Sequence, residues 1–425
     1  MENDEIIGSV NNGNYLGCLE LLAEYDPFLA EHIQQRANKG RGHISYLSST
    51  ICDEFILIIS DQLMRQVIQE TKDAKYYSVS VDSTPDVSHS DQLTLIIRYV
   101  TASGPVERFI KFIPIYEHTG ESLAKILLTF LEGNGISITN CRGQSYDNAS
   151  NMSGKYNGMQ AWIRKENSLA EYIPCCGHSL NLVGQNSVDS CPVAVYFFDF
   201  VQKLFVFFSA STHRWNLLLT GFTPLGIPTL KRLSDTRWSA HHDAVDALQK
   251  GYKTIQQILV SMSESTTEKA DTRLEAKGLV AIMNKLETGL MVQVWSMILE
   301  RFDKTSKCLQ DSKLDLNTAT KMLQSLKTFV QALRSQFSEI EQKCKILYQN
   351  DAYHQEHKRQ IKRNRKWDYR DAEADDADAG LTPSDKFKIH TFLPIIDKIL
   401  SALNHRISAS SVIDDRFGFC LKLIL

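Results

Sequence analysis

The chain has 425 residues, 43% hydrophobic and 23% charged, a composition typical of a globular protein with about two or three domains. Its formal net charge of −3 excludes an overall basic field, so contact with nucleic acid or an anionic membrane would need local patches. Nine scattered cysteines without a CxxC pair favour reduced thiols in an intracellular protein over a disulfide framework.

The first segment, residues 1–73, is predicted to be helical. After a helix cap at Thr50, apolar residues recur at the spacing of one helix face. These residues are Ile51, Phe55, Ile58, Ile59, Leu63 and Val67.

After the helix, the spacing of apolar residues changes from that of a helix face to the alternation of a strand, which indicates the beginning of a sheet. Tyr77, Val79 and Val81 alternate with polar residues, which is the pattern of a strand. Further strands are predicted over 93–100 and 108–115, joined by a turn at Ala102-Ser-Gly-Pro105. We expect these three strands to form an antiparallel meander.

Helices and short strands alternate in the next segment. We predict a helix over 120–131, a strand over 141–146, a helix over 152–164, and a strand that turns into a helix over 172–182. This order is compatible with the topology of ribonuclease H. Other α/β folds share it, so the order supports that fold without proving it.

The second half is predicted to be helical. The apolar stretch 192–210 contains Asp199, Gln202 and Lys203, which favours a buried core helix over a membrane span. Between 316 and 347, apolar residues step by three and four, which predicts one amphipathic helix. Blocks of opposite charge at 357–366 and 371–378 predict a solvated loop. A helix resumes with a cap at Ser384.

Two aspartates could hold a divalent metal. Asp82 is expected at the end of the first strand and Asp147 just after the fourth. Carboxylates at neighbouring strand ends share one crevice, and Mg²⁺ or Mn²⁺ would neutralise their repulsion. Two such ions, about 4 Å apart, promote phosphodiester cleavage. Alternatively, both aspartates cap turns.

Cys175, Cys176 and His178 form a second cluster. A zinc site would need further ligands, and a Cys–His nucleophilic pair is rarely so close in sequence, so packing and hydrogen bonding are favoured. We therefore expect Cys175 and His178 to be structural and to bind no zinc.

Arg237 and Trp238 could together bind an unpaired nucleotide, the ring stacking on the base and the guanidinium holding a phosphate. The alternative, favoured by these two residues alone, is a buried tryptophan beside a surface arginine. The basic run 362–366 could be a nuclear address or a phosphate patch.

Four segments carry a family resemblance: SVSVDSTPDVSHSDQLTLIIRYV, GQSYDNASNMSGKYNGMQ, CCGHSLNLV and SDTRWSAHHDAV. In this order they resemble hAT-superfamily transposases, and more closely their domesticated relatives, the zinc finger MYM-type protein 1-like and DUF4371 domain-containing proteins. The resemblance spans about residues 15 to 420.

The resemblance implies an α/β fold: a ribonuclease-H-like core with N-terminal helices and a large all-helical insertion. The core would occupy 74–212, the insertion 213–350, a charged linker 351–382 and a truncated C-terminal helical segment 383–425. Asp82 and Asp147 match the first two acids of the family's metal-binding triad, Cys175 and His178 its CxxH element, and Arg237 and Trp238 the motif beside the cut.

The departures from the family concern both ends. The resemblance implies an N-terminal zinc finger and a third acid in a C-terminal AERxFS-like motif, and the sequence contains neither. We therefore expect both ends to be missing and the catalytic triad to be incomplete.

Three functional hypotheses remain open: a domesticated nucleic-acid-associated protein without catalysis, a catalytically competent transposase fragment that uses Mg²⁺ or Mn²⁺, and an unrelated metal-dependent nuclease. The missing third acid favours the first over the second, and the CxxH and Arg-Trp elements disfavour the third. The resemblance implies a nuclear protein, otherwise cytoplasmic. The expected partners are DNA, bound weakly and without sequence specificity, and homo- or hetero-oligomers with related proteins; no membrane contact is expected.

Overall fold

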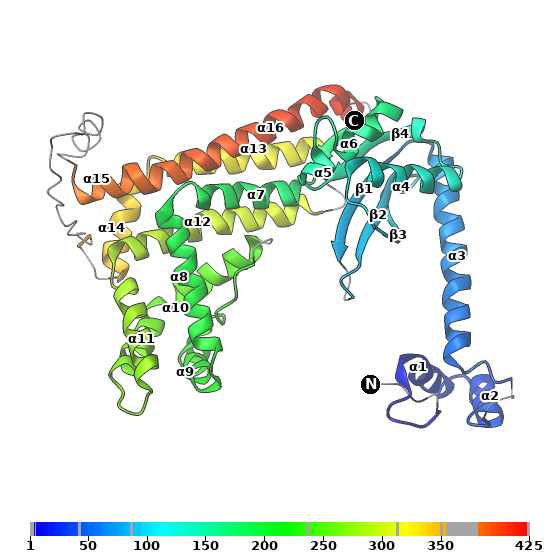
Figure 1. Ribbon diagram of the computed structural model, residues 1–425, viewed down its shortest axis with the longest axis horizontal. Coiled ribbons are helices and arrows are strands. Elements are labelled where there is room, and N and C mark those ends of the chain that lie inside the picture. The colour runs from blue at the N-terminus through cyan, green and yellow to red at the C-terminus, as the bar shows by residue number, and fades with distance from the viewer. Residues whose placement is uncertain are drawn as a thin grey trace. The chain divides into compact units, whose positions relative to one another are not determined.

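The computed structural model describes residues 4, 6–40, 44–85, 88–234, 238–311, 314–348, 352–353 and 381–422 (Figure 1). The chain divides into two compact units. The first contains residues 1–144 and 162–170, and the second contains 145–161 and 171–425. Each unit is described separately below.

The first unit combines helices with most of the sheet, and the chain then passes through elements shared by both units. In order, the elements are α1 (Gly13–Ala23), α2 (Pro27–Arg36), α3 (Ser49–Ala74), β1 (Tyr77–Pro85), β2 (Asp91–Thr101), β3 (Gly104–Pro114), α4 (Gly120–Gly133), β4 (Cys141–Tyr146), α5 (Ser150–Ser153), α6 (Met159–Glu166) and β5 (Glu171–Pro174). The five strands lie in the order β3-β2-β1-β4-β5. The coarse α/β prediction is confirmed.

The predicted meander is confirmed as β1, β2 and β3, which pair antiparallel. Val79 lies opposite Ile97, and both side chains are buried because alternate residues of each strand face the core. Pro105 lies inside β3, which its place at the edge of the sheet permits, since proline cannot donate a ladder hydrogen bond.

Helix α3 begins earlier than predicted. Its N-cap is Ser48, whose side chain accepts a hydrogen bond from the Ile51 amide, and not Thr50. All the apolar residues predicted for one helix face lie in α3, yet Phe55, Ile59 and Leu63 are between 48% and 59% exposed. No other described element of the first unit covers these turns (Figure 1).

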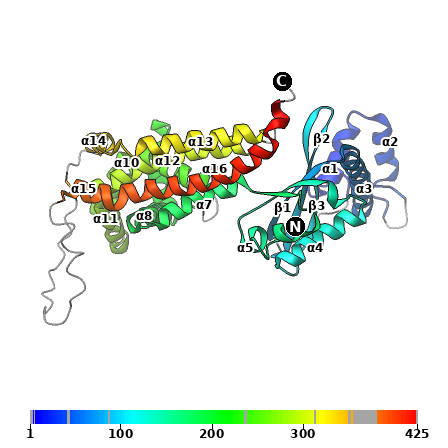
Figure 2. The same cartoon turned by 90° about the horizontal axis from the view of Figure 1, so that it is seen from above.

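The second unit is almost entirely helical from β5 onward. Its helices are α7 (Cys176–Asp189), α8 (Pro192–Ser209), α9 (Thr212–Phe222), α10 (Trp238–Glu264), α11 (Ala270–Met283), α12 (Leu286–Leu309), α13 (Leu316–Leu333), α14 (Phe337–Tyr348), α15 (Pro383–Phe387) and α16 (Leu393–Lys422). One apolar core runs through α7 to α16, and Figure 2 shows α7, α13 and α16 extending together. The predicted boundaries at 213 and 383 therefore fall inside one packed unit.

Helix α8 lies in this core, as predicted for the stretch 192–210. Among the described helices it alone is long and apolar enough to cross a membrane. Phe197, Leu204 and Phe208 are buried among the other helices, which accounts for its hydropathy.

Two predicted single helices are each broken. The helix predicted over 152–164 is α5 and α6, separated by a tight turn in which a side chain on Gly158 would clash with the backbone of Gly154. The helix predicted over 316–347 ends at Leu333 and restarts at Phe337. Periodicity did not reveal this second break, because Leu333 and Phe337 are four residues apart and both buried.

The C-terminal helices also begin differently. Thr382, and not Ser384, caps α15 through a capping box with Asp385, because Pro383 is suited to the first helical position. Apart from residues 352–353 and 381–382, the predicted linker lies outside the described residues, as does the basic run 362–366.

Candidate nucleic-acid interface

Asp147 lies in a tight loop directly after β4, in the second unit. Its Oδ1 accepts a hydrogen bond from the Ala149 amide at 3.1 Å, so the turn-capping alternative is observed for this residue. The Tyr172 hydroxyl donates to the Asp147 carbonyl at 3.1 Å. Burial, and then the charges of Asp147 and Cys175, raise the pKa of Tyr172 to about 12, so the phenol keeps its proton at neutral pH.

The start of α7 contacts this loop. The Cys175 amide donates to the Tyr146 carbonyl at 2.8 Å, and the Asn148 side chain donates to Ser179 Oγ at 3.0 Å. The segments GQSYDNAS and CCGHSLN, separate in sequence, are thus joined by backbone and side-chain hydrogen bonds.

The cysteines and the histidine of this segment differ in exposure. The Cys175 side chain is exposed, whereas Cys176 is half-buried, and burial raises the pKa of the Cys176 thiol. His178 is also half-buried. Within the described ranges, no group of three or more His, Cys, Asp or Glu side chains is placed to hold a metal ion.

Zinc content tests the structural role predicted for Cys175 and His178. We expect the purified protein to contain less than stoichiometric zinc, because a structural zinc site requires about four ligands. Elemental analysis of the wild type and of Cys175→Ala measures this, with Cys308→Ala, which removes another exposed thiol, as the control. Stoichiometric zinc that is lost only in Cys175→Ala would overturn the prediction.

Trp238 opens α10 and lies in the core of the second unit, 6% exposed. Its indole stacks on His241 with ring centres 4.5 Å apart and packs near Phe198 and Trp295. The indole also lies against Gly184 of α7, and any side chain at position 184 would overlap the ring. This placement matches the buried-tryptophan alternative, and stacking on a base would require the ring to leave its pocket.

Asn181 connects α7 to the Trp238 segment, since its side-chain oxygen accepts from the Trp238 amide at 3.4 Å. Three of the four quoted segments therefore meet in the second unit through α7. Arg237 lies outside the described residues.

Asp82 belongs to the first unit. It lies inside β1 opposite Thr94, and pairing continues to Pro85 opposite Asp91, so the prediction that Asp82 ends the strand is wrong by three residues. Strand β2 begins at Asp91, two residues before its predicted start, so the pairing of β1 with β2 continues beyond the alternating residues Tyr77 to Val81. The pairing of Asp82 with Asp147 across the two units stays a prediction.

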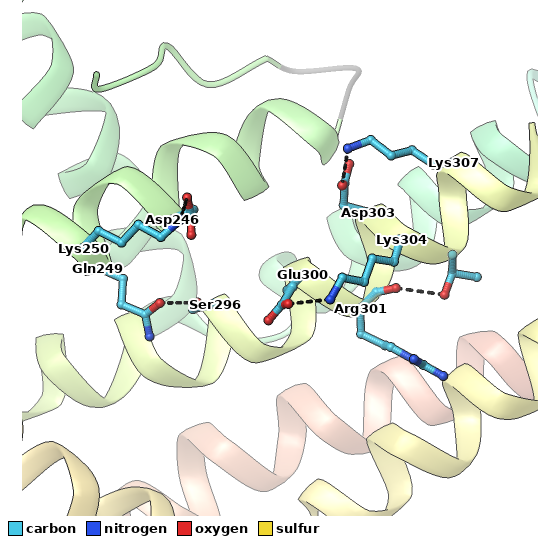
Figure 3. A network of polar contacts seen from close by, with 10 residues as sticks. Asp246, Gln249, Lys250, Ser296, Glu300, Arg301, Asp303, Lys304 and Lys307 are labelled. Atoms are coloured by element: carbon cyan, nitrogen blue, oxygen red, sulfur yellow. Dashed lines mark hydrogen bonds and ion pairs between the residues drawn. The ribbon is translucent and has the colours of Figure 1, made fainter. Parts of the chain in front are cut away.

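Three acids of the helical region, Asp246, Glu300 and Asp303, pair with lysines on their own helices (Figure 3). Glu300 and Lys304 are 2.6 Å apart on α12, and the hydrogen bond from Lys304 lowers the pKa of Glu300. Asp303 pairs with Lys307 in the same way. Glu300 therefore lies on a solvated, ion-paired helix face, the interpretation that its amphipathic setting favours.

Sequence reasoning missed a groove of about 520 Å³ in the second unit. Phe205 of α8 and Trp215 of α9 supply its aromatic groups and Lys231 and Arg232 its cationic groups, and hydroxyl, amide and leucine side chains line the rest. No carboxylate is among its lining residues, which are Phe205, Ser209, Ser211, Thr212, Trp215, Asn216, Thr229, Leu230, Lys231 and Arg232.

The segment 227–234 that carries the two cations is fixed to the core. Leu230 is buried, and the Leu233 amide donates to the Gln202 side chain of α8 at 3.0 Å. Lys231 and Arg232 are exposed, and neither forms an ion pair with a described residue. A signal for this site was present in the sequence: Arg214-Trp215 is a second Arg-Trp pair, and Lys231-Arg232 lies one residue before the segment SDTRWSAHHDAV.

The fold and these contacts define an α/β protein whose five-stranded sheet leads into a helical unit. Residues 1–158 match DUF4371, described as the ZMYM1/FAM200 RNase-like domain. The DUF4371 resemblance predicted from the motifs is thereby confirmed.

Two curated relatives carry the same name, 52 kDa repressor of the inhibitor of the protein kinase. The Homo sapiens protein is 26% identical over 214 residues, which are 48% of this chain and 28% of that protein. The Mus musculus protein shows the same identity and coverage. The chain thus spans little more than a quarter of the length of these relatives.

Proposed function

We propose that this chain derives from a hAT transposase, contains a ribonuclease-H-like core, and binds nucleic acid without cutting it. Support comes from the RNase-like match over residues 1–158 and from the order of the four motifs. The relatives named as repressors favour a binding role, and we propose a nuclear location on that ground.

The groove at Trp215, Lys231 and Arg232 carries the binding proposal. Its two cations, which form no ion pair with a described residue, match phosphates, and the half-buried Trp215 ring offers a surface for a base. An aromatic surface next to cations is the usual arrangement for single-stranded nucleic acid, in which stacking contributes about 1–3 kcal/mol per base. The net charge of −3 leaves few other phosphate contacts, so binding is weak and non-specific.

The second candidate function is metal-dependent strand cleavage. Asp147 supplies one carboxylate in the second unit, and Asp82 would have to supply the other. Mg²⁺ or Mn²⁺ on these oxygens would stabilise the attacking and leaving oxygens of a phosphodiester. The family resemblance assigns a third acid to this chemistry, and no motif in the chain matches it.

The salt dependence of binding to a single-stranded oligonucleotide tests the groove. We expect Lys231→Ala/Arg232→Ala to weaken binding and to reduce the slope of log K against log salt by about 1.4, since each lost phosphate contact on a single strand contributes about 0.7. Fluorescence anisotropy at several salt concentrations measures both quantities.

Lys277→Ala/Lys321→Ala is the matched control, because it removes the same charge from exposed positions on α11 and α13. Trp215→Phe should keep most of the affinity and Trp215→Ala should lose it. Equal slopes for both double variants would show that the groove does not hold phosphates. Nanomolar, sequence-selective binding at physiological salt would contradict the weak, non-specific mode.

A further inference from the structure

Helix α3 ends in a turn that side chains rarely adopt. Lys75, directly after the helix, has φ 62° and ψ −58°, and the Tyr76 amide donates to the Ala74 carbonyl at 2.7 Å. These values describe the strained form of the γ-turn, which persists only where neighbouring contacts hold it. One such contact is the ring of Tyr76, whose centre lies 5.3 Å from the Lys75 ammonium nitrogen.

A second cation lies over the same ring. The Arg142 guanidinium of β4 is 4.4 Å from the centre of the Tyr76 ring, and Figure 1 shows β4 beside the end of α3. Arg142 also donates to the carbonyls of Thr139 at 2.8 Å and Cys141 at 3.1 Å, which fix its position. The face of an aromatic ring attracts a cation without neutralising its charge. The two cations beside Tyr76 therefore keep their full charge for a further partner.

Lys72 places a third cation at this end of the sheet. Its carbonyl accepts a hydrogen bond from the Lys75 amide at 3.1 Å. Its ammonium nitrogen lies against Gly135, 3.2 Å from the position of an added Cβ. Because Gly135 opens the segment that leads to Arg142, all three cations border the end of the sheet at which β1 and β4 begin.

These cations differ from a basic residue of the first unit that has a carboxylate partner. Arg98 pairs with Glu107 at 2.6 Å, whereas no carboxylate of the described residues forms an ion pair with Lys72, Lys75 or Arg142. The two lysines are exposed and Arg142 is half-buried. Like charges that gather without a counter-charge repel one another, and an anion bound among them removes that repulsion.

The chemistry of the three groups is suited to phosphates. A guanidinium can bind two oxygens of a phosphate at once, and an ammonium group adds a point charge beside it. Three cations on two separate segments fit consecutive phosphates of one strand better than they fit a single phosphate. All three lie within residues 1–158, and the match of this range to an RNase-like domain favours a nucleic acid over an anionic membrane.

We propose that Lys72, Lys75, Tyr76 and Arg142, here called the α3–β1 cluster, bind the phosphodiester backbone of a nucleic-acid strand without reading its bases. Tyr76 holds two of the cations in place, and the cations contact the phosphates. The cluster lies in the first unit and the groove at Trp215 in the second, so the two sites are separate and this proposal does not rest on the groove.

Fluorescence anisotropy of labelled oligodeoxythymidine with the full chain tests the cluster, and Lys231→Ala/Arg232→Ala serves as the background that removes the groove cations. In this background we expect salt-sensitive binding to persist. Adding Lys72→Gln/Lys75→Gln should weaken it further and reduce the slope of log K against log salt by about 1.4, since each phosphate contact on a single strand contributes about 0.7.

Lys39→Gln/Lys111→Gln is the matched control, because it removes the same charge from exposed positions of the same unit. Equal slopes for the two glutamine pairs would overturn the proposal. A background variant that no longer binds the oligonucleotide would overturn it as well, because the cluster would then hold no strand by itself. Binding that depends on the cluster but not on Lys231 and Arg232 would support this site and contradict the groove.

Tyr76→Leu tests the cluster without a change of net charge. Loss of the ring should release Lys75 and Arg142 and weaken binding by about threefold, whereas Tyr76→Phe should stay within about twofold of the wild type. Circular dichroism verifies that each variant is folded. Equal affinities for Tyr76→Leu and the wild type would contradict the role of the ring. Binding to vesicles of phosphatidylserine and phosphatidylcholine, without binding to the oligonucleotide, would assign the cluster to a membrane and overturn the proposal.

Discussion

Trp238→Ala is expected to lower the free energy of unfolding by about 3–5 kcal/mol, because it leaves a large cavity in a packed aromatic cluster. The ring is 6% exposed and lies against Phe198, His241 and Trp295. Denaturant unfolding measures the loss. Trp215→Ala, which removes a half-buried tryptophan at the groove, should cost well under half as much.

Gly184→Ala provides a second measure of the same contact. An added methyl group would overlap the indole, so we expect a loss of about 1–3 kcal/mol from overpacking. In a Trp238→Ala background this penalty should largely vanish, since the methyl group would occupy vacated space. A Trp238→Ala variant that keeps full stability but loses DNA binding would show instead that the ring leaves the core to stack on a base.

Incubation of the chain with Mn²⁺ and nicked or hairpin DNA is expected to give no cleavage and no strand transfer. In-line displacement at phosphorus builds charge on two oxygens, and a pair of fixed metal ions supplies most of the stabilisation. Two aspartates without a third acid should leave the second ion unpositioned, which corresponds to a rate lower by several powers of ten. Gel electrophoresis of end-labelled DNA measures the products.

Asp82→Ala and Asp147→Ala are the diagnostic variants, and Asp243→Ala, an exposed aspartate on α10, is the control. Cleavage by the wild type that disappears in the first two variants and persists in the control would favour the catalytic alternative. Glu300 would then be a poor choice for the third acid, because Lys304 already holds it on the face of α12.

Much of the architecture was predictable because local patterns and tertiary packing agree. Burial alternates along β1 from Tyr77 to Val81 and along β2 from Leu93 to Tyr99, and the buried side chains of Val79 and Ile97 follow this alternation. The strand that turns into a helix, predicted over 172–182, is confirmed as β5 followed by α7, with Cys175 as the N-cap between them. In such segments one period specifies both the element and its buried face.

Features that depend on contacts distant in sequence were not predictable. The burial of Trp238 requires a glycine at position 184, and no local pattern links the two positions. The groove combines Trp215 with two cations on a segment without regular structure, so it has no period to detect. The exposure of Phe55 on α3 likewise depends on which neighbours the fold provides, and the helical pattern alone suggests a core face.

The path of the chain between its two units limits how the protein can be dissected. Residues 162–170 return to the first unit after the chain has entered the second. Asn167 donates to the carbonyls of Ile138 and Cys141, and the buried Gln144 side chain donates to the Ala170 carbonyl at 2.9 Å. An expression fragment that stops at residue 158, where the family match ends, would strip Gln144 of its buried acceptor. A soluble fragment of the sheet therefore has to extend at least through residue 170, and no single proteolytic cut can release either unit whole.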